Sequence, residues 1–240
     1  MLQKATAGAV LALGLSMASG AAVAATVDLS SLVNANIRSY TNGSVYPNGP
    51  TTISVGGVGF NLVADGATPN SLGVIQTPAG DSSFTIPVSL TGVTTVYTLI
   101  NSAFGASGDT TGSLVFHDMA GDTFTYNLTE GVNVRDHFNG AFINTAPGVF
   151  GTATFTGPGG TDRLDAQQII LPSSFAGSTL TSIVFNGVNA GNPAGEPFLA
   201  AITTSTVAVP EPGTWALLLL GLGAIGAGFR TRRRESFAAA

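Results

Sequence analysis

The chain has 240 residues, a formal net charge of −5 and no cysteine, so disulfide bonds and cysteine catalysis are excluded. Only two histidines occur, and the sequence contains no H-E-x-x-H zinc motif, no P-loop and no G-x-S-x-G nucleophile motif. Residues 26–209 hold 11 acidic residues against three arginines and no lysine, so no nucleic-acid partner is expected.

The first 25 residues have the three parts of a secretory signal peptide. Lys4 supplies the positive charge, residues 5–17 are apolar, and small residues follow. The triplets 22–24 (Ala-Val-Ala) and 23–25 (Val-Ala-Ala) both suit signal peptidase, so we expect the mature chain to begin at residue 25 or 26. The sequence therefore predicts an exported protein with a signal peptide over residues 1–25.

Residues 26–205 are predicted to form one all-β domain. In the segment 112–128, Leu114 and Phe116 face Phe124 and Tyr126 across the turn "MAGD", which predicts an antiparallel hairpin. Many short segments of this kind, bounded by Gly, Pro, Asn and Asp, favour an antiparallel, jelly-roll-like β-sandwich. The predicted strands cover residues 51–63, 71–76, 82–90, 95–104, 112–118, 122–128, 131–136, 164–171, 180–188 and 196–204.

One stretch of the body, "VRDHF", brings a base, an acid and an imidazole together. Arg135, Asp136 and His137 form a candidate ligand patch, suited to hydrogen bonds with sugar hydroxyls. The alternative is a salt bridge at a strand end, with the aliphatic part of Arg135 covering core residues.

Two further groups have both a functional and a structural interpretation. Asp118 and Asp122 carry the oxygen ligands that calcium prefers, but they flank a predicted turn, where Asp is common. Tyr40 and Tyr46 would suit an aromatic sugar platform, or simply lie in a loop rich in Gly and Pro. The sequence predicts no catalytic residue, no metal site and no cofactor.

The last segment, residues 206–240, differs from the body. Prolines at 210 and 212 disfavour helix over the motif 209–212. Residues 213–229 carry no charge, and a helix of this length spans roughly 26 Å, close to a ~30 Å hydrocarbon core. Four arginines follow within 230–234, and arginines of this kind remain in the cytoplasm. We therefore expect a transmembrane helix over residues 213–229; a buried helix ending in surface arginines is the alternative.

The order of these three parts resembles the C-terminal sorting signal of PEP-CTERM proteins, a family of diderm bacteria that make exopolysaccharide. The resemblance implies that Pro210, Glu211 and Pro212 form the motif recognised by exosortase, a membrane enzyme that cuts near it. The helix and the arginine-rich tail would retain the precursor in the inner membrane until processing. The mature protein would then belong to the cell envelope or the extracellular space.

The body has a broader resemblance to jelly-roll sandwiches of the galactose-binding-like kind. It is carried by "VYPNGPTTISVGGVGFNLV", "VYTLINSAFG", "GVNVRDHF" and "LAAIT", and it implies a surface that contacts carbohydrate. The function favoured at this stage is a non-enzymatic envelope or matrix protein whose partners are exosortase and a glycan or exopolysaccharide. The alternative is a secreted, glycan-active hydrolase that uses two of the acids.

Overall fold

The computed structural model describes residues 23–40, 43–66, 68–77, 82–140, 142–188, 195–206 and 221–222. Residues 22–209 form one compact unit. Several predicted segments lie outside the described residues. They are the motif Pro210–Glu211–Pro212, the arginine-rich tail, most of the signal peptide (residues 1–25) and most of the transmembrane helix (residues 213–229). Within the described ranges, no helix has the length and apolar character needed to cross a membrane.

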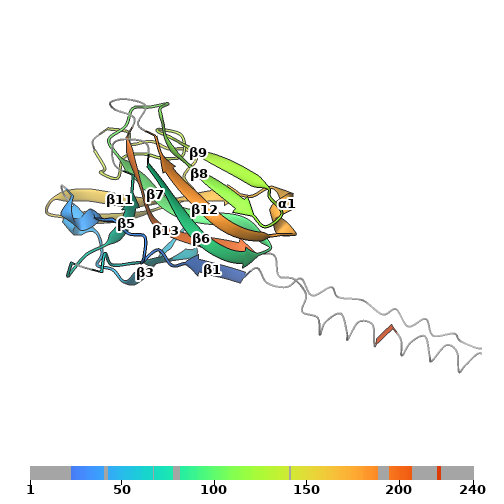
Figure 1. Ribbon diagram of the computed structural model, residues 1–240. Coiled ribbons are helices and arrows are strands. Elements are labelled where there is room, and N and C mark those ends of the chain that lie inside the picture. Colours follow the sequence, from blue (N-terminus) through green and yellow to red (C-terminus); the bar gives the residue numbers. More distant parts are fainter. Residues whose placement is uncertain are drawn as a thin grey trace, which may run out of the picture. The chain divides into compact units, whose positions relative to one another are not determined.

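The body is built from antiparallel strands, as the sequence predicts (Figure 1). Its larger sheet has β13 near its centre, paired with β7 on one side and with β5 and β1 on the other. In spatial order the strands are β10 (Gly151–Gly157), β11 (Gly160–Ile170), β7 (Val93–Ala103), β13 (Glu196–Thr206), β5 (Gly73–Gln76) and β2 (Ala35–Asn36), with β1 (Val23–Val27) also along β13.

The second sheet has four strands and contains the predicted hairpin. Leu114 lies opposite Tyr126 and Phe116 lies opposite Phe124, so the predicted pairing is confirmed. The turn between them includes Gly121 at a φ of 92°, a conformation that glycine adopts at low cost. The strand order is β6 (Ser82–Thr91), β12 (Thr179–Gly187), β8 (Thr110–Asp118) and β9 (Thr123–Thr129), and the short helix α1 (Ser173–Ala176) precedes β12.

The main hydrophobic core lies between the two sheets. Successive side chains of a strand point to opposite faces, so Val96 and Ile100 of β7 face the core while Leu99 faces away from it. From the smaller sheet, Phe116 and Phe185 enter the same cluster. This is the apolar interior expected of a sandwich.

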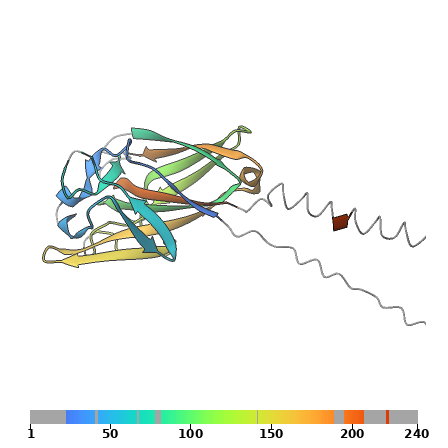
Figure 2. The ribbon, with the colours of Figure 1, turned by 90° about the horizontal axis from the view of Figure 1, so that it is seen from below.

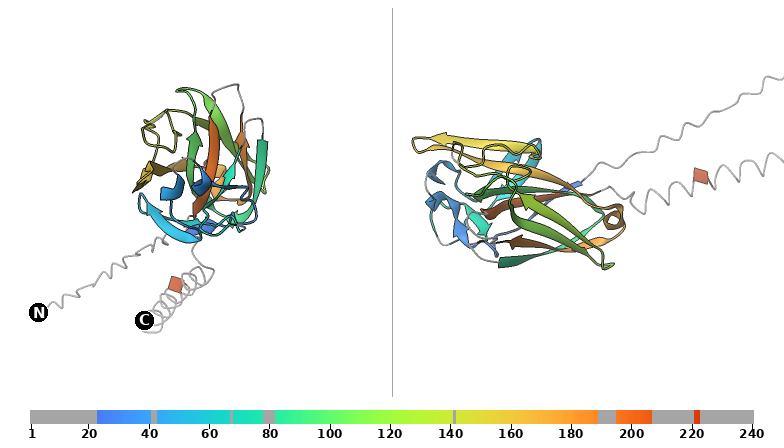
Figure 3. Two further views of the ribbon diagram at one scale, coloured as in Figure 1. Left: turned by 90° about the vertical axis from the view of Figure 1, so that its left-hand side faces the viewer. Right: turned by 90° about the horizontal axis from the view of Figure 1, so that it is seen from above.

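A second core covers the other face of the larger sheet. Leu99 and Phe198 contact a layer made from the N-terminal part of the chain, including Tyr46 and Phe60. Because both faces of β7 and β13 are covered, these strands are buried almost continuously rather than alternately. The layer consists of the hairpin β3 (Thr51–Val55) and β4 (Val58–Leu62) and the 3-10 helices η1 (Ile37–Ser39) and η2 (Gly43–Val45), and Figures 2 and 3 show it from other sides.

The segment after β9 lies between the ends of β7 and β11. The Ser102 amide donates to the Arg135 carbonyl at 3.1 Å, and the His137 amide donates to the Ser102 carbonyl at 2.9 Å. On the other side, the Arg163 amide donates to the His137 carbonyl at 2.9 Å. The predicted strand 131–136 is therefore wrong in detail, because these residues form turns and isolated bridges between two longer strands. This insertion places "VRDHF" beside the larger sheet.

Strand β1 begins where signal-peptide cleavage is predicted. Val23 pairs with Thr206 and Ala25 pairs with Thr204, so the start of β1 lies beside the end of β13. Cleavage after Ala24 or Ala25 would leave only the last two or three residues of this strand on the sheet.

Candidate functional site

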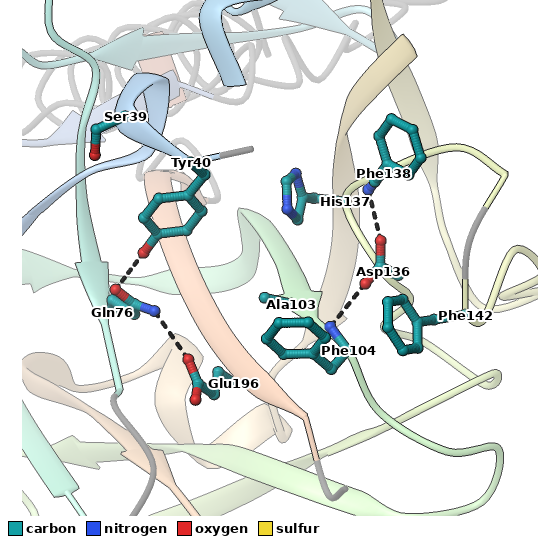
Figure 4. Close-up of a pocket in the computed structure, with 10 residues that line it drawn as sticks. All are labelled: Ser39, Tyr40, Gln76, Ala103, Phe104, Asp136, His137, Phe138, Phe142 and Glu196. Atoms are coloured by element: carbon teal, nitrogen blue, oxygen red, sulfur yellow. Dashed lines mark hydrogen bonds between the residues drawn. The ribbon is translucent and has the colours of Figure 1, made fainter. Parts of the chain in front are cut away.

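A pocket of about 570 Å³ opens where five distant segments meet at one end of the larger sheet. Its size falls within the range of small-ligand sites. η1, the end of β5, the end of β7 and the start of β13 contribute to it, together with the inserted segment around residue 137. The lining residues are Ser39, Tyr40, Gln76, Ala103, Phe104, Asp136, His137, Phe138, Phe142 and Glu196 (Figure 4).

One wall of the pocket is a chain of hydrogen bonds. The Tyr40 hydroxyl donates to Gln76 Oε1, and Gln76 Nε2 donates to Glu196 Oε2 at 3.2 Å. Burial, together with the negative charge of Glu196, raises the pKa of Tyr40 to about 12 against the lowering effect of the Gln76 bond. Tyr40 therefore keeps its proton at neutral pH, and the chain ends on a carboxylate.

The opposite wall is organised by Asp136. Its Oδ2 accepts from the Phe104 amide and its Oδ1 from the Phe138 amide, both at 2.7 Å. Burial raises the pKa of Asp136 to about 6, although the two amides and Arg163 act in the opposite direction. The carboxylate thus fixes the backbone of two aromatic residues that line the pocket (Figure 4).

Phe104 and Phe142 are exposed although both are large and apolar. The two residues are 50% and 58% exposed, and their rings meet edge to face with centroids 5.2 Å apart. Both have left-handed backbones, with φ of 70° and 47°. This conformation destabilises an L-residue by on the order of 1 kcal/mol. Backbone strain and exposed aromatic rings occur together here at a pocket, as they do at many ligand sites.

His137 lines the pocket from its buried side. Its Nδ1 lies 3.1 Å from the Tyr46 hydroxyl and 3.6 Å from Asp162 Oδ1. Burial and the positive charge of Arg163 lower the pKa of His137 to about 4, so the imidazole is neutral at physiological pH. It offers the pocket a polar ring without a charge.

Arg135 has a different environment from its two neighbours. Its Nε and Nη2 bind the two oxygens of Asp165 at 2.7 and 2.8 Å, and Nη1 donates to the Asn144 carbonyl at 2.8 Å. Asp165 is fully buried. The structure thus brings Asp136 and His137 into the pocket, while Arg135 makes an ion pair outside its lining.

Of the other candidate residues that the structure describes, only Tyr40 lies in the pocket lining. Tyr40 lines the pocket, whereas Tyr46 is buried in the second core. Asp118 Oδ1 accepts from the Asp122 amide at 2.8 Å, an ordinary turn interaction. Across the described ranges, no three His, Asp or Glu side chains are grouped in a way that could hold a metal ion.

Sequence reasoning missed four residues that shape the pocket: Gln76, Phe104, Phe142 and Glu196. Phe104 and Phe142 are marked by their left-handed backbone and their exposure, and Gln76 and Glu196 by their place in the pocket. All of these are properties of the fold. The motif "FG" at 104–105 hints at a turn but not at a ligand site.

Comparison with known families finds a match in the tail. Residues 208–234 match the PEP-CTERM protein-sorting motif. The predicted resemblance of the tail to a PEP-CTERM sorting signal is thereby confirmed, and the motif indicates an exported protein sorted by exosortase. No curated protein is significantly similar to the chain.

Proposed function

We propose that this protein is a non-enzymatic component of the cell envelope or extracellular matrix, and that its body binds glycan in the pocket beside Phe104 and Phe142. The observation that carries the proposal is this pair of exposed, edge-to-face rings, which are held at the pocket by left-handed backbone. Sugar rings have apolar faces that pack on aromatic side chains, while their hydroxyls need nearby polar groups. Tyr40, Gln76 and Glu196 supply such groups.

The sorting step uses the tail. A helix over residues 213–229 would anchor the precursor in the inner membrane, with the arginines on the cytoplasmic side. The two prolines disfavour helix over residues 209–212, and an extended backbone is the form that a protease binds. Glu211 provides a charge for recognition just outside the bilayer.

Replacing Pro210, Glu211 and Pro212 together by alanine should leave the full-length precursor in the membrane of a host that has exosortase. The reason is that helix can then extend into the cleavage segment and the charged contact is lost. Membrane fractionation and mass spectrometry of the chain measure the result. A control with three alanines at the exposed Asp122, Thr123 and Asn127 should be processed normally. Normal processing of the tail variant would contradict the proposed recognition.

Glycan binding is tested by titrating the full chain, in detergent micelles, with neutral oligosaccharides. We expect dissociation constants in the millimolar range, about −4 kcal/mol. Phe142→Gly should abolish binding without unfolding, because glycine adopts the positive φ of this position more easily than phenylalanine does. Calorimetry or NMR measures the affinity, and circular dichroism verifies the fold.

The matched control is Phe150→Ala. Phe150 is also partly exposed, at 38%, but it packs on Tyr97 outside the pocket. This variant should bind as the wild type does. Binding that survives Phe142→Gly would place the glycan elsewhere.

A glycan hydrolase is the second candidate, since two carboxylates, Asp136 and Glu196, line the same pocket. We favour binding over hydrolysis because both oxygens of Asp136 already accept backbone N–H groups, which hold this carboxyl group in a structural role. Release of reducing ends during the titration would establish hydrolysis instead.

A further inference from the structure

The pocket is surrounded by more negative than positive charge. Asp136 and Glu196 line it. The Glu130 carboxyl group lies beside Gly105 and Gly195, the chain neighbours of the lining residues Phe104 and Glu196, because a Cβ atom built on either glycine would approach Glu130 Oε1 to 2.8 or 2.7 Å. Asp162, beside His137, adds a fourth acid. An anionic ligand would be repelled.

The three arginines of the body lie outside the pocket lining and donate to other groups. Its only basic residues are Arg38, Arg135 and Arg163. Arg38 Nε donates to the Asn70 carbonyl, and Arg135 pairs with Asp165. The Arg163 side chain is buried and donates to the Asp136 carbonyl and to neighbouring groups. None of the three lines the pocket.

The hydrogen-bond chain on the pocket wall leaves an acceptor at its end. The Tyr40 hydroxyl donates a hydrogen bond to Gln76, and the Gln76 amide donates to one oxygen of Glu196. Among the residues that the structure describes, no hydrogen bond occupies the second oxygen of Glu196, so this oxygen can accept from a donor of the ligand. The neutral His137 adds no positive charge to compete with it.

Aromatic faces complete the preference. Phe104 and Phe142 stand exposed at the pocket, and Tyr40 and Phe138 also line it. The face of an aromatic ring is electrically negative and attracts cations, most strongly ammonium groups that have lost part of their water.

We propose that the pocket recognises the protonated amine of an amino sugar, with Glu196 as its counter-ion and the rings of Phe104 and Phe142 against the apolar face of the sugar. This inference rests on the proposed glycan-binding function and narrows it to a glycan that carries free amino groups. Acetylation of the amine removes both the charge and the ion pair, so the N-acetylated form is the natural competitor against which selectivity is measured.

The test compares three probes on the full chain in detergent micelles: a β-1,4-linked glucosamine tetramer, its fully N-acetylated counterpart, and choline. The wild type should bind the free amine about tenfold more tightly than the acetylated tetramer, and high salt should reduce this ratio. Glu196→Gln should bring the two affinities within about twofold, because it keeps the shape and removes the charge. Asp122→Asn, an exposed acid outside the pocket, should keep the full preference.

The outcomes separate this inference from the proposal beneath it. Equal binding of both tetramers by the wild type, lost in Phe142→Gly, would overturn the amine preference and keep glycan binding. Binding of choline alone, weakened by Glu196→Gln, would support the ammonium site and overturn the glycan function. An unchanged preference in Glu196→Gln would overturn Glu196 as the counter-ion, and binding of none of the probes would overturn both proposals.

Discussion

Replacing Arg135 by alanine should lower the free energy of unfolding by about 3–5 kcal/mol, because it leaves the buried charge of Asp165 without its cation. Asp165 is 0% exposed and is held by the Arg135 guanidinium through both of its oxygens. Its remaining donors, Asn101 Nδ2 at 2.8 Å and Thr152 Oγ1 at 2.6 Å, are neutral and cannot balance the charge.

Urea denaturation followed by far-UV circular dichroism measures this loss. Arg38→Ala is the matched control: Arg38 makes one side-chain bond to a carbonyl near the surface, and we expect a loss below about 1 kcal/mol. In an Asp165→Asn background, Arg135→Ala should lower the free energy of unfolding much less, since no buried charge is then left unpaired. A loss of less than about 1 kcal/mol in the wild-type background would show that water reaches Asp165 when the arginine is removed.

This ion pair also explains why Arg135 does not share a ligand site with Asp136 and His137, although the sequence pattern predicts one shared site. Three consecutive residues suggest one surface, yet the environment of Arg135 is set by Asp165, which lies 30 residues further along the chain. Binding assays on Arg135 variants would therefore report on folding as well as on ligand. Asp136 is similar, because its carboxylate holds the backbone of Phe104 and Phe138.

The strands could be predicted from the sequence where one face of the strand is exposed to solvent. In β6 and β9, exposed residues alternate with half-buried or buried ones, and the sequence predicts both strands. β10 was missed, since "GTATFTG" has only Ala153 and Phe155 as apolar residues. β1 was missed because its small residues also suit signal peptidase.

The third layer and the pocket depend on long-range contacts. The pattern of the β3–β4 hairpin shows which residues are apolar, but not that they cover the outer face of the larger sheet. In the pocket, Tyr40 and Gln76 are 36 positions apart, and Gln76 and Glu196 are 120 apart. No local pattern links such residues, so only the folded structure reveals the site.

We expect Glu130 to be a large source of pH-dependent stability in the body. It is 0% exposed, and within the described part of the chain neither of its carboxylate oxygens has a hydrogen-bond partner of good geometry. Burial raises the pKa of Glu130 to about 7; a contact with the Ser102 hydroxyl lowers it, and the charges of Asp136 and Asp109 raise it further.

The direction of the pH effect follows from this shift. In the unfolded chain Glu130 has its ordinary pKa of 4.5, so between about pH 4.5 and 7 the folded state holds a proton that the unfolded state has released. Stability is therefore greatest below that interval and falls as the pH rises through it, by about 3 kcal/mol in total. Asp136 and Asp162, with pKa values raised by burial to about 6, act in the same direction. His137, with its pKa lowered to about 4, acts in the opposite one.

Glu130→Gln should consequently stabilise the protein by about 2–3 kcal/mol at pH 8 and change its stability little at pH 4.5. The amide has the shape of the protonated acid and no charge to desolvate, so the benefit exists only where the wild-type group is forced to ionise. Urea denaturation at a series of pH values measures it, and Asp122→Asn, at an exposed acid, should follow the wild-type curve. The residual slope of Glu130→Gln belongs to Asp136, Asp162 and His137. Parallel curves for Glu130→Gln and the wild type would mean that the carboxylate is solvated in the folded state, because a desolvated charge cannot be removed without a pH-dependent gain.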